Sequence, residues 1–203
     1  MGTKASEGSS TLFLDAEPGD DGPEACHQQF ETDCEHTELL AVTMTRSPSE
    51  WTDAYQKYVG PVPDELSIVA VGETTRSASA GTSPKGLLKR HRPTVTAIEE
   101  PGDLTGLAMR MDDRFEEWRQ SAAEDTHRAV CFGSLTTLLQ FVDLETAFRF
   151  LHVMTRQVAQ VGAVAHFHIA PDAHDEQTLA TIKSLFDFVV EAGASEDGGQ
   201  GSA

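Results

Sequence analysis

The chain is short of lysine and has a marked deficit of positive charge. Its 203 residues include 33 acidic and 15 basic residues, for a formal net charge of −18. Only five of the basic residues are lysines, namely Lys4, Lys57, Lys85, Lys89 and Lys183. Such an acidic chain is not expected to bind DNA unaided, because the phosphates of DNA are also negative.

Cysteines and long apolar runs are also scarce. The three cysteines, Cys26, Cys34 and Cys131, are odd in number and form no Cys-x-x-Cys pair, which argues against a disulfide framework. No stretch approaches the roughly 18 consecutive apolar residues of a transmembrane helix, and residues 1–10 lack the apolar centre of a signal peptide. We therefore expect a cytoplasmic protein without a membrane partner.

The acidic excess indicates a salty solvent. A surface this acidic repels itself in dilute buffer, whereas at molar salt the Debye length falls to about 3 Å and the repulsion is screened. Halophilic proteins use high net charge in this way. We interpret the composition as salt adaptation; the alternative is an ordinary acidic protein.

One domain accounts for most of the chain. Residues 1–10 and 193–203 are too polar to bury a core, and we predict that both ends are disordered. Between them, short apolar runs alternate with helical patterns. The predicted strands cover residues 11–14, 38–45, 66–72, 94–98, 128–132 and 163–169, and helices are predicted after Ser47, after Asp103, over 143–161 and over 175–191.

This alternation predicts an α/β fold of three αβα layers, with a mostly parallel sheet of about six strands. The predicted strands are continuous apolar runs, which is typical of strands covered by helices on both faces. Ligand sites in such folds lie at the carboxyl ends of the strands. We expect the core to contain Cys131 and five phenylalanines, namely Phe132, Phe141, Phe148, Phe150 and Phe167.

Two stretches carry a resemblance to a known class of proteins. Residues 128–140 (RAVCFGSLTTLLQ) and 143–153 (DLETAFRFLHV) resemble the matching region of RecA/KaiC-type ATPases. Continued through His166-Phe167-His168 and residues 172–176 (DAHDE), the chain resembles an uncharacterised family of KaiC-related proteins from halophilic archaea. The resemblance implies a RecA-like domain over residues 11–192, a P-loop after the first strand and a Walker B acid at the end of a later strand.

The first of these two motifs is degenerate. A P-loop reads G-x-x-x-x-G-K-[ST] and needs its Lys and hydroxyl for the phosphates and Mg²⁺. The corresponding turn is EPGDDGPE at residues 17–24, with Gly19 inside it. Gly22 keeps the second glycine of the motif, but Pro23 stands in place of Lys and Glu24 in place of Ser/Thr. The acidic side chains of this turn would repel a triphosphate.

The second motif is also degenerate. A Walker B strand ends in an Asp that helps to hold Mg²⁺. Here the strand ends in Gly133, followed by Ser134, and no carboxylate occurs before Asp143. We therefore predict a pseudo-ATPase that binds neither ATP nor Mg²⁺ as a cofactor. The alternative is that the match to this scaffold arises by chance among many doubly wound folds.

Three histidines form a second candidate site. His166 and His168 lie two apart on a predicted strand and so share one face, and His174 follows just beyond that strand. Imidazoles can bind zinc or another transition metal. The alternative is that one histidine is packed and hydrogen-bonded while the others are solvated.

Two further groups have simpler interpretations. Ser134, Thr136 and Thr137 are expected to cap the turn after the fifth strand rather than to act as nucleophiles. The basic cluster Lys85, Lys89, Arg90, His91 and Arg92 could hold a phosphate, nucleic acid or an acidic partner, or be a solvated loop.

The leading hypothesis for function is a non-catalytic regulatory or protein-interaction domain. By analogy with RecA-type domains, homo-oligomers or a mixed assembly with an active KaiC-like relative are expected. The alternatives are an enzyme or sensor that uses a metal or small ligand at the histidines, and an accessory domain in transcriptional signalling.

Overall fold

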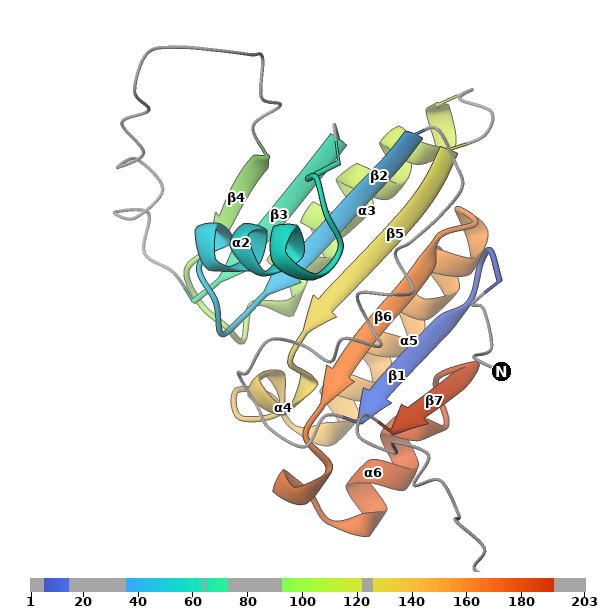
Figure 1. Cartoon of the computed structure of the whole chain (residues 1–203). Coiled ribbons are helices and arrows are strands. Elements are labelled where there is room, and N and C mark those ends of the chain that lie inside the picture. Colours follow the sequence, from blue (N-terminus) through green and yellow to red (C-terminus); the bar gives the residue numbers. More distant parts are fainter. Residues whose placement is uncertain (1–5, 15–35, 64, 73–92, 122–125, 192–203) are drawn as a thin grey trace, which may run out of the picture.

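A single parallel sheet with helices on both faces forms the described part of the chain (Figure 1). The computed structural model describes residues 6–14, 36–63, 65–72, 93–121 and 126–191. Within these ranges seven strands are found, each parallel to its neighbours, in the order β4-β3-β2-β5-β6-β1-β7. They are β1 (Ser10–Leu14), β2 (His36–Thr43), β3 (Glu65–Val71), β4 (Thr94–Ile98), β5 (Thr126–Gly133), β6 (Val164–Ile169) and β7 (Phe188–Glu191). The predicted α/β fold class is confirmed.

The strand order reverses between β2 and β5. From β2 the chain proceeds outward through β3 to β4, whereas from β5 it proceeds the other way through β6. The first strand, β1, lies between β6 and β7 rather than at this reversal. In open α/β sheets, ligands bind outside the carboxyl ends of the strands near such a reversal.

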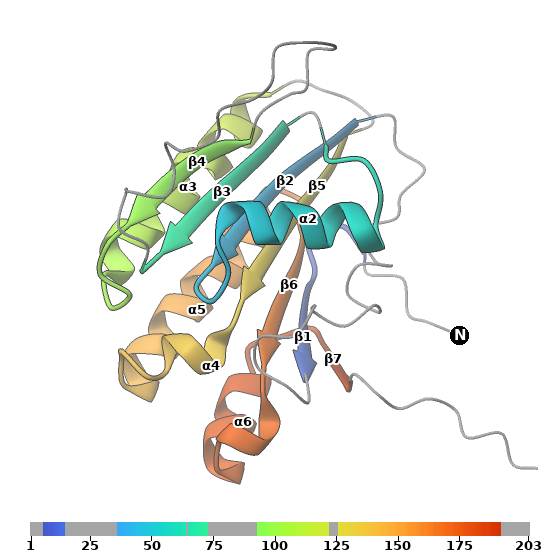
Figure 2. The ribbon, with the colours of Figure 1, turned by 60° about the vertical axis from the view of Figure 1, so that its left-hand side comes forward.

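Helices cover the two faces of the sheet unequally (Figure 2). On one face lie α3 (Leu104–Gln120) and α5 (Leu144–Gln160). The short helices α4 (Leu135–Leu138) and α6 (Glu176–Lys183) pack on the same face. On the opposite face α2 (Pro48–Tyr58) packs Trp51 and Tyr55 against β2 and β3. The helix predicted after Ser47 is confirmed and begins with a capping box. The Ser47 hydroxyl accepts from the Glu50 N–H, and the Glu50 carboxylate accepts from the Ser47 N–H.

Alternation along the strands divides the core in two. Leu12, Phe132 and Phe167 point to the α3–α5 face, whereas Phe13 and Cys131 point to the α2 face. Every residue of β6 is buried, so this strand has no solvent-facing side. Phe132, Phe150, Phe167 and Cys131 are buried as predicted.

Two predictions about the core and the last helix are wrong. Phe141, expected in the core, exposes 51% of its surface, because it lies in the turn between α4 and α5. The last helix was expected to continue to residue 191, but it ends at Lys183 and is followed by the seventh strand.

Hydrogen bonds between Asp187 and Ser10 position the seventh strand. Its carboxylate accepts hydrogen bonds from the backbone N–H of Ser10 at 2.8 Å and from the Ser10 hydroxyl at 2.9 Å. Its own N–H donates to the Ser10 carbonyl at 3.0 Å. These bonds align residues 188–191 beside β1. The run Phe188-Val189-Val190 then suits an edge strand, since β-branched and aromatic residues favour extended structure.

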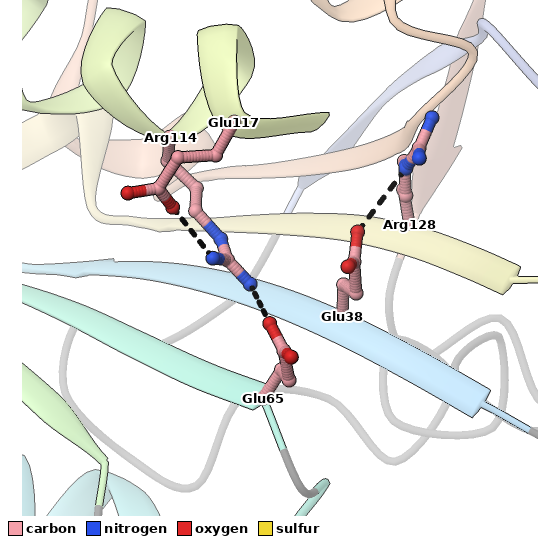
Figure 3. A network of polar contacts seen from close by, with 5 residues as sticks. All are labelled: Glu38, Glu65, Arg114, Glu117 and Arg128. Carbon is pink, nitrogen blue, oxygen red and sulfur yellow. Dashed lines mark hydrogen bonds and ion pairs between the residues drawn. The ribbon is translucent and has the colours of Figure 1, made fainter. Parts of the chain in front are cut away.

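Ion pairs tie α3 to the amino-terminal edge of the sheet (Figure 3). Arg114 of α3 contacts Glu65 of β3 at 3.0 Å and Glu117 at 2.7 Å, and its guanidinium lies 5.6 Å from the Trp118 ring. Beside it, Arg128 of β5 pairs with Glu38 of β2 at 3.1 Å. Only 13% of the Arg114 side chain is exposed, so its positive charge depends on these partners.

We predict that Arg114→Met lowers the free energy of unfolding by about 1–2 kcal/mol. The substitution removes two charge-assisted hydrogen bonds, and the loss is moderate because both glutamate partners are largely exposed to solvent. Arg110→Met is the matched control, since Arg110 forms an exposed pair with Asp113 at 3.6 Å, and its effect should stay within about 0.5 kcal/mol. Urea unfolding at molar salt measures both. Equal effects of the two substitutions would contradict the structural role of Arg114.

Candidate functional site

The carboxyl ends of β1, β6 and β5 lie next to one another at one edge of the sheet (Figure 1). Leu14, the last residue of β1, pairs with Ile169, the last residue of β6. On its other side β6 pairs with β5 up to Phe132 and Phe167. The segments that follow β1 and β5 are those in which the sequence resemblance implies the P-loop and the Walker B acid.

The end of β5 has an unusual backbone. Ser134 has φ 78°, and it is the one non-glycine residue with positive φ in the described part of the chain. Left-handed backbone costs a non-glycine residue roughly 1–2 kcal/mol. Ser134 gains in return by capping α4, because its hydroxyl accepts from the Thr137 N–H at 3.1 Å and from the Thr137 hydroxyl at 2.9 Å. The predicted capping role is thus confirmed for Ser134.

Gly133 is closely packed against the end of β2. A Cβ atom at this position would lie 3.2 Å from the Val42 carbonyl oxygen. A side chain at Gly133 would therefore require the end of β2 to shift by a few tenths of an ångström. The local packing suits glycine, where the resemblance implies an aspartate.

Thr136 joins the ends of β5 and β6 instead of capping α4. Its hydroxyl oxygen accepts a hydrogen bond from the Ala170 N–H at 2.9 Å and lies 3.1 Å from Nε2 of His174. Burial lowers the pKa of His174 below its ordinary value, although the negative charge of Asp175 acts in the opposite direction. Thr136 is only 5% exposed, whereas His174 is half-buried, and their contact connects α4 to the segment that follows β6.

Two acidic side chains close to this edge are committed to helix caps. Asp143 accepts from the Thr146 N–H at 2.8 Å at the start of α5, and Asp175 accepts from the Thr178 N–H at 2.7 Å at the start of α6. The backbone hydrogen bonds lower the pKa of both carboxyl groups. Both caps are therefore ionised at neutral pH and place negative charge where a phosphate would otherwise be attracted.

The three predicted metal ligands are divided between two places. His166 and His168 lie on the α2 face of β6, and both contact the Phe13 ring, at centroid distances of 5.3 and 5.4 Å. His174 lies beyond the strand against Thr136. Among the described residues, no three His, Cys, Asp or Glu side chains are arranged to hold a metal ion.

A cysteine accompanies the two strand histidines. Cys131 of β5 is paired with His166 across the sheet, and its sulfur lies 4.0 Å from Nε2 of His168. The sequence pattern alone did not indicate this approach, because it depends on β5 and β6 being neighbours with this register. In the sequence, a Cys on one buried strand and two His on another would indicate such an approach once the two strands are known to be neighbours.

The remaining predicted positions lie outside the described residues. These are Gly19, Gly22, Pro23 and Glu24 of the degenerate P-loop, and Lys85, Lys89, Arg90, His91 and Arg92 of the basic cluster. Among the helices that are described, none is both long and apolar enough to span a membrane.

The fold and this edge define an α/β protein with one parallel sheet, helices on both faces and a β5 strand that ends in glycine. The chain belongs to DUF7504, a family of unknown function whose model matches residues 8–192. A search of curated proteins finds no significant match.

A solved structure from Pyrococcus horikoshii OT3, described as a structural study of Project ID PH0250, shares the fold. Its TM-score is 0.54 at 12% sequence identity, over 96% of this chain and 86% of that one. At this identity the similarity concerns the fold alone.

The strained Ser134 backbone yields a stability prediction. Ser134→Ala removes the cap and keeps the left-handed strain, so we expect the free energy of unfolding to fall by about 1 kcal/mol. Ser134→Gly loses only a few tenths of a kcal/mol of capping and relieves the strain, so it should be neutral or stabilising. Denaturant unfolding of the two variants measures the difference, and a glycine variant less stable than the alanine variant would refute it.

His174 should also give the fold a pH dependence. With the folded pKa below the unfolded value, the neutral imidazole stabilises the fold above about pH 6.5. That contribution is lost as the pH falls from the unfolded pKa through the folded one. An NMR titration of the His174 ring should show a midpoint below 6.5, and His174→Asn should remove this part of the pH dependence. A midpoint at or above the ordinary value would contradict the prediction.

Proposed function

We propose that this protein is a non-catalytic regulatory or protein-interaction domain of the RecA/KaiC type, a pseudo-ATPase acting in signal transduction in a halophile. The observation that carries the proposal is the end of β5. There Gly133 is packed against the Val42 carbonyl and Ser134 caps α4, in the place where the resemblance implies a carboxylate for Mg²⁺.

The described residues do not fit Mg²⁺–ATP at this edge. The next acidic residue along the chain, Asp143, holds the first turn of α5. Mg²⁺ is usually held by one or two carboxylates together with the phosphates of the substrate. With glycine at the end of β5 and Asp143 engaged as a cap, the described residues provide no carboxylate for Mg²⁺ at the end of this strand.

The strand arrangement supports the RecA/KaiC part of the proposal. Strand β6 separates β1 from β5, and all three end at the same edge. The strands that precede the implied P-loop and the implied Walker B acid therefore lie on either side of one strand. This supports descent from a nucleotide-binding scaffold that has lost both charged elements.

The charge of the chain supports protein partners rather than nucleic acid. At −18, the surface favours partners that carry basic patches, since complementary charge steers association and suppresses wrong partners. By analogy with RecA-type domains, an active KaiC-like relative and further copies of the chain are also proposed as partners. Repulsion between copies is screened at molar salt. The same acidic excess supports a cytoplasm of high salt content.

A second candidate is a metal or small-ligand sensor. It is favoured by His166 and His168, which share the α2 face of β6. Metal analysis of the purified protein separates the two proposals, since a stoichiometric metal lost in a His166→Ala/His168→Ala variant would favour the sensor.

Calorimetric titration with Mg²⁺–ATP at molar salt tests the leading proposal. We expect no heat of binding and no phosphate release, because the triphosphate and Mg²⁺ ligands implied by the resemblance are missing. A KaiC-type ATPase with an intact P-loop, titrated in the same buffer, serves as the positive control. Micromolar binding or measurable turnover by the present chain would overturn the pseudo-ATPase proposal.

A further inference from the structure

The outer side of β4 is a free edge of the sheet. In the strand order β4 comes last on its side, and among the described residues no strand lies beyond it (Figures 1 and 2). The backbone N–H and C=O groups that point outward from such an edge are a template for a further strand. The hydrogen bonds between β4 and β3 indicate which residues carry these groups.

Val95 and Ala97 carry the outward groups of β4. The Ile98 carbonyl oxygen accepts from the Gly72 N–H at 2.8 Å, in the parallel register of β3 and β4. The N–H and C=O of one residue point to the same side of a strand, and successive residues alternate. Thr96 and Ile98 therefore bond to β3, whereas Val95 and Ala97 each direct one donor and one acceptor away from the sheet.

These outward groups are complementary to themselves. A two-fold axis through Thr96 places the β4 strand of a second copy antiparallel to the first. Val95 of each copy then lies opposite Ala97 of the other, and each such pair exchanges both of its N–H···O bonds. Thr96 lies opposite the Thr96 of the second copy, and Thr–Thr pairs between strands are favourable. Pro93 has no N–H, so the pairing ends there.

The two edges of the sheet differ in their protection against strand addition. Proteins protect edges with very short strands, with charged side chains or with proline. The edge strand β7 has four residues and ends in the charged Glu191. The edge strand β4 has five residues, TVTAI, without a charge or a proline, and Val95 exposes 38% of its surface. Of the two edges, β4 is therefore the better suited to accept a strand.

The charges on either side of β4 in the sequence favour a second copy as the partner. The basic cluster of residues 85–92 precedes the strand, and Glu99 and Glu100, both exposed, follow it. An antiparallel pair places the carboxyl end of each β4 beside the amino end of the other. The order of charges along this part of the chain is thus complementary to itself in the antiparallel direction.

We propose that two copies of the protein form a two-fold dimer by pairing their β4 strands into one continuous sheet. The dimer rests on the proposed interaction role, since it names the surface that binds a further copy. A five-residue edge gives an interface at the small end of the specific range, so the dimer is weak and transient. Because both copies carry a charge of −18, we expect it to be stronger at molar salt than in dilute buffer.

Oxidative cross-linking of a Thr96→Cys variant at molar salt, with diamide as the oxidant, tests the register. Cys26→Ser and Cys34→Ser are introduced throughout, and Cys131 is kept because it is buried. Facing residues of a non-hydrogen-bonded antiparallel pair have Cα atoms about 4.5 Å apart, which is within the range of a disulfide. We expect disulfide-linked dimers. Val153→Cys is the control, since Val153 is 48% exposed and lies on α5; it should cross-link at least about tenfold more slowly.

Sedimentation equilibrium at molar salt measures the association without a cross-link. Val95→Pro removes an outward N–H and leaves the hydrogen bonds to β3, so it should weaken dimerisation by at least about tenfold. Val95→Lys tests the same edge if the proline variant fails to fold, because a charge on an edge strand opposes pairing. Val153→Lys is its matched control and should leave the association unchanged.

Three results would each overturn the β4 dimer. They are a protein that stays monomeric up to about 1 mM, equal cross-linking of the Thr96→Cys and Val153→Cys variants, and undiminished association of folded Val95→Lys. None of them bears on ATP binding, which the calorimetric titration tests separately, so failure of the dimer and failure of the pseudo-ATPase proposal are distinguishable.

Discussion

The parallel direction of all seven strands is the constraint on which the rest of this structure depends. Parallel neighbours need crossover connections, and these place the strands under helices and gather their carboxyl ends at one edge. The alternation of side chains along β5 and β6 then separates two environments. Phe132 and Phe167 pack toward α3 and α5, while Cys131, His166 and His168 face the other way.

The two edges of the sheet have different chemistry. At the amino-terminal edge, charged pairs such as Arg114–Glu65 and Arg128–Glu38 join strands and helix. At the carboxyl edge, the contacts around β5 and β6 are made by hydroxyls, through Ser134 and Thr136. Ion pairs thus join strands and helix at one edge, whereas at the other edge hydroxyl groups connect α4 to the ends of β5 and β6, beside the ionised caps Asp143 and Asp175.

Much of the fold could be predicted from local patterns. The strand at residues 94–98 has the predicted bounds, and the capping Asp143 and its helix lie where the sequence placed them. The seventh strand could not be predicted in this way, because it depends on Asp187 reaching Ser10, a partner 177 residues away in the chain. The exposure of Phe141 likewise depends on how the turn after α4 lies on the body of the protein.

The features of the candidate site also divide into those set by the local sequence and those set by contacts between distant residues. The sequence by itself determined that Gly133 and Ser134 follow the apolar run at residues 128–132, that no carboxylate occurs between this run and Asp143, and that the chain carries a net charge of −18. Only the tertiary structure decided that Thr136 meets His174 and that Cys131 lies 4.0 Å from His168. Side-chain identity and capping are local properties, whereas these contacts depend on which strands are neighbours and on their register.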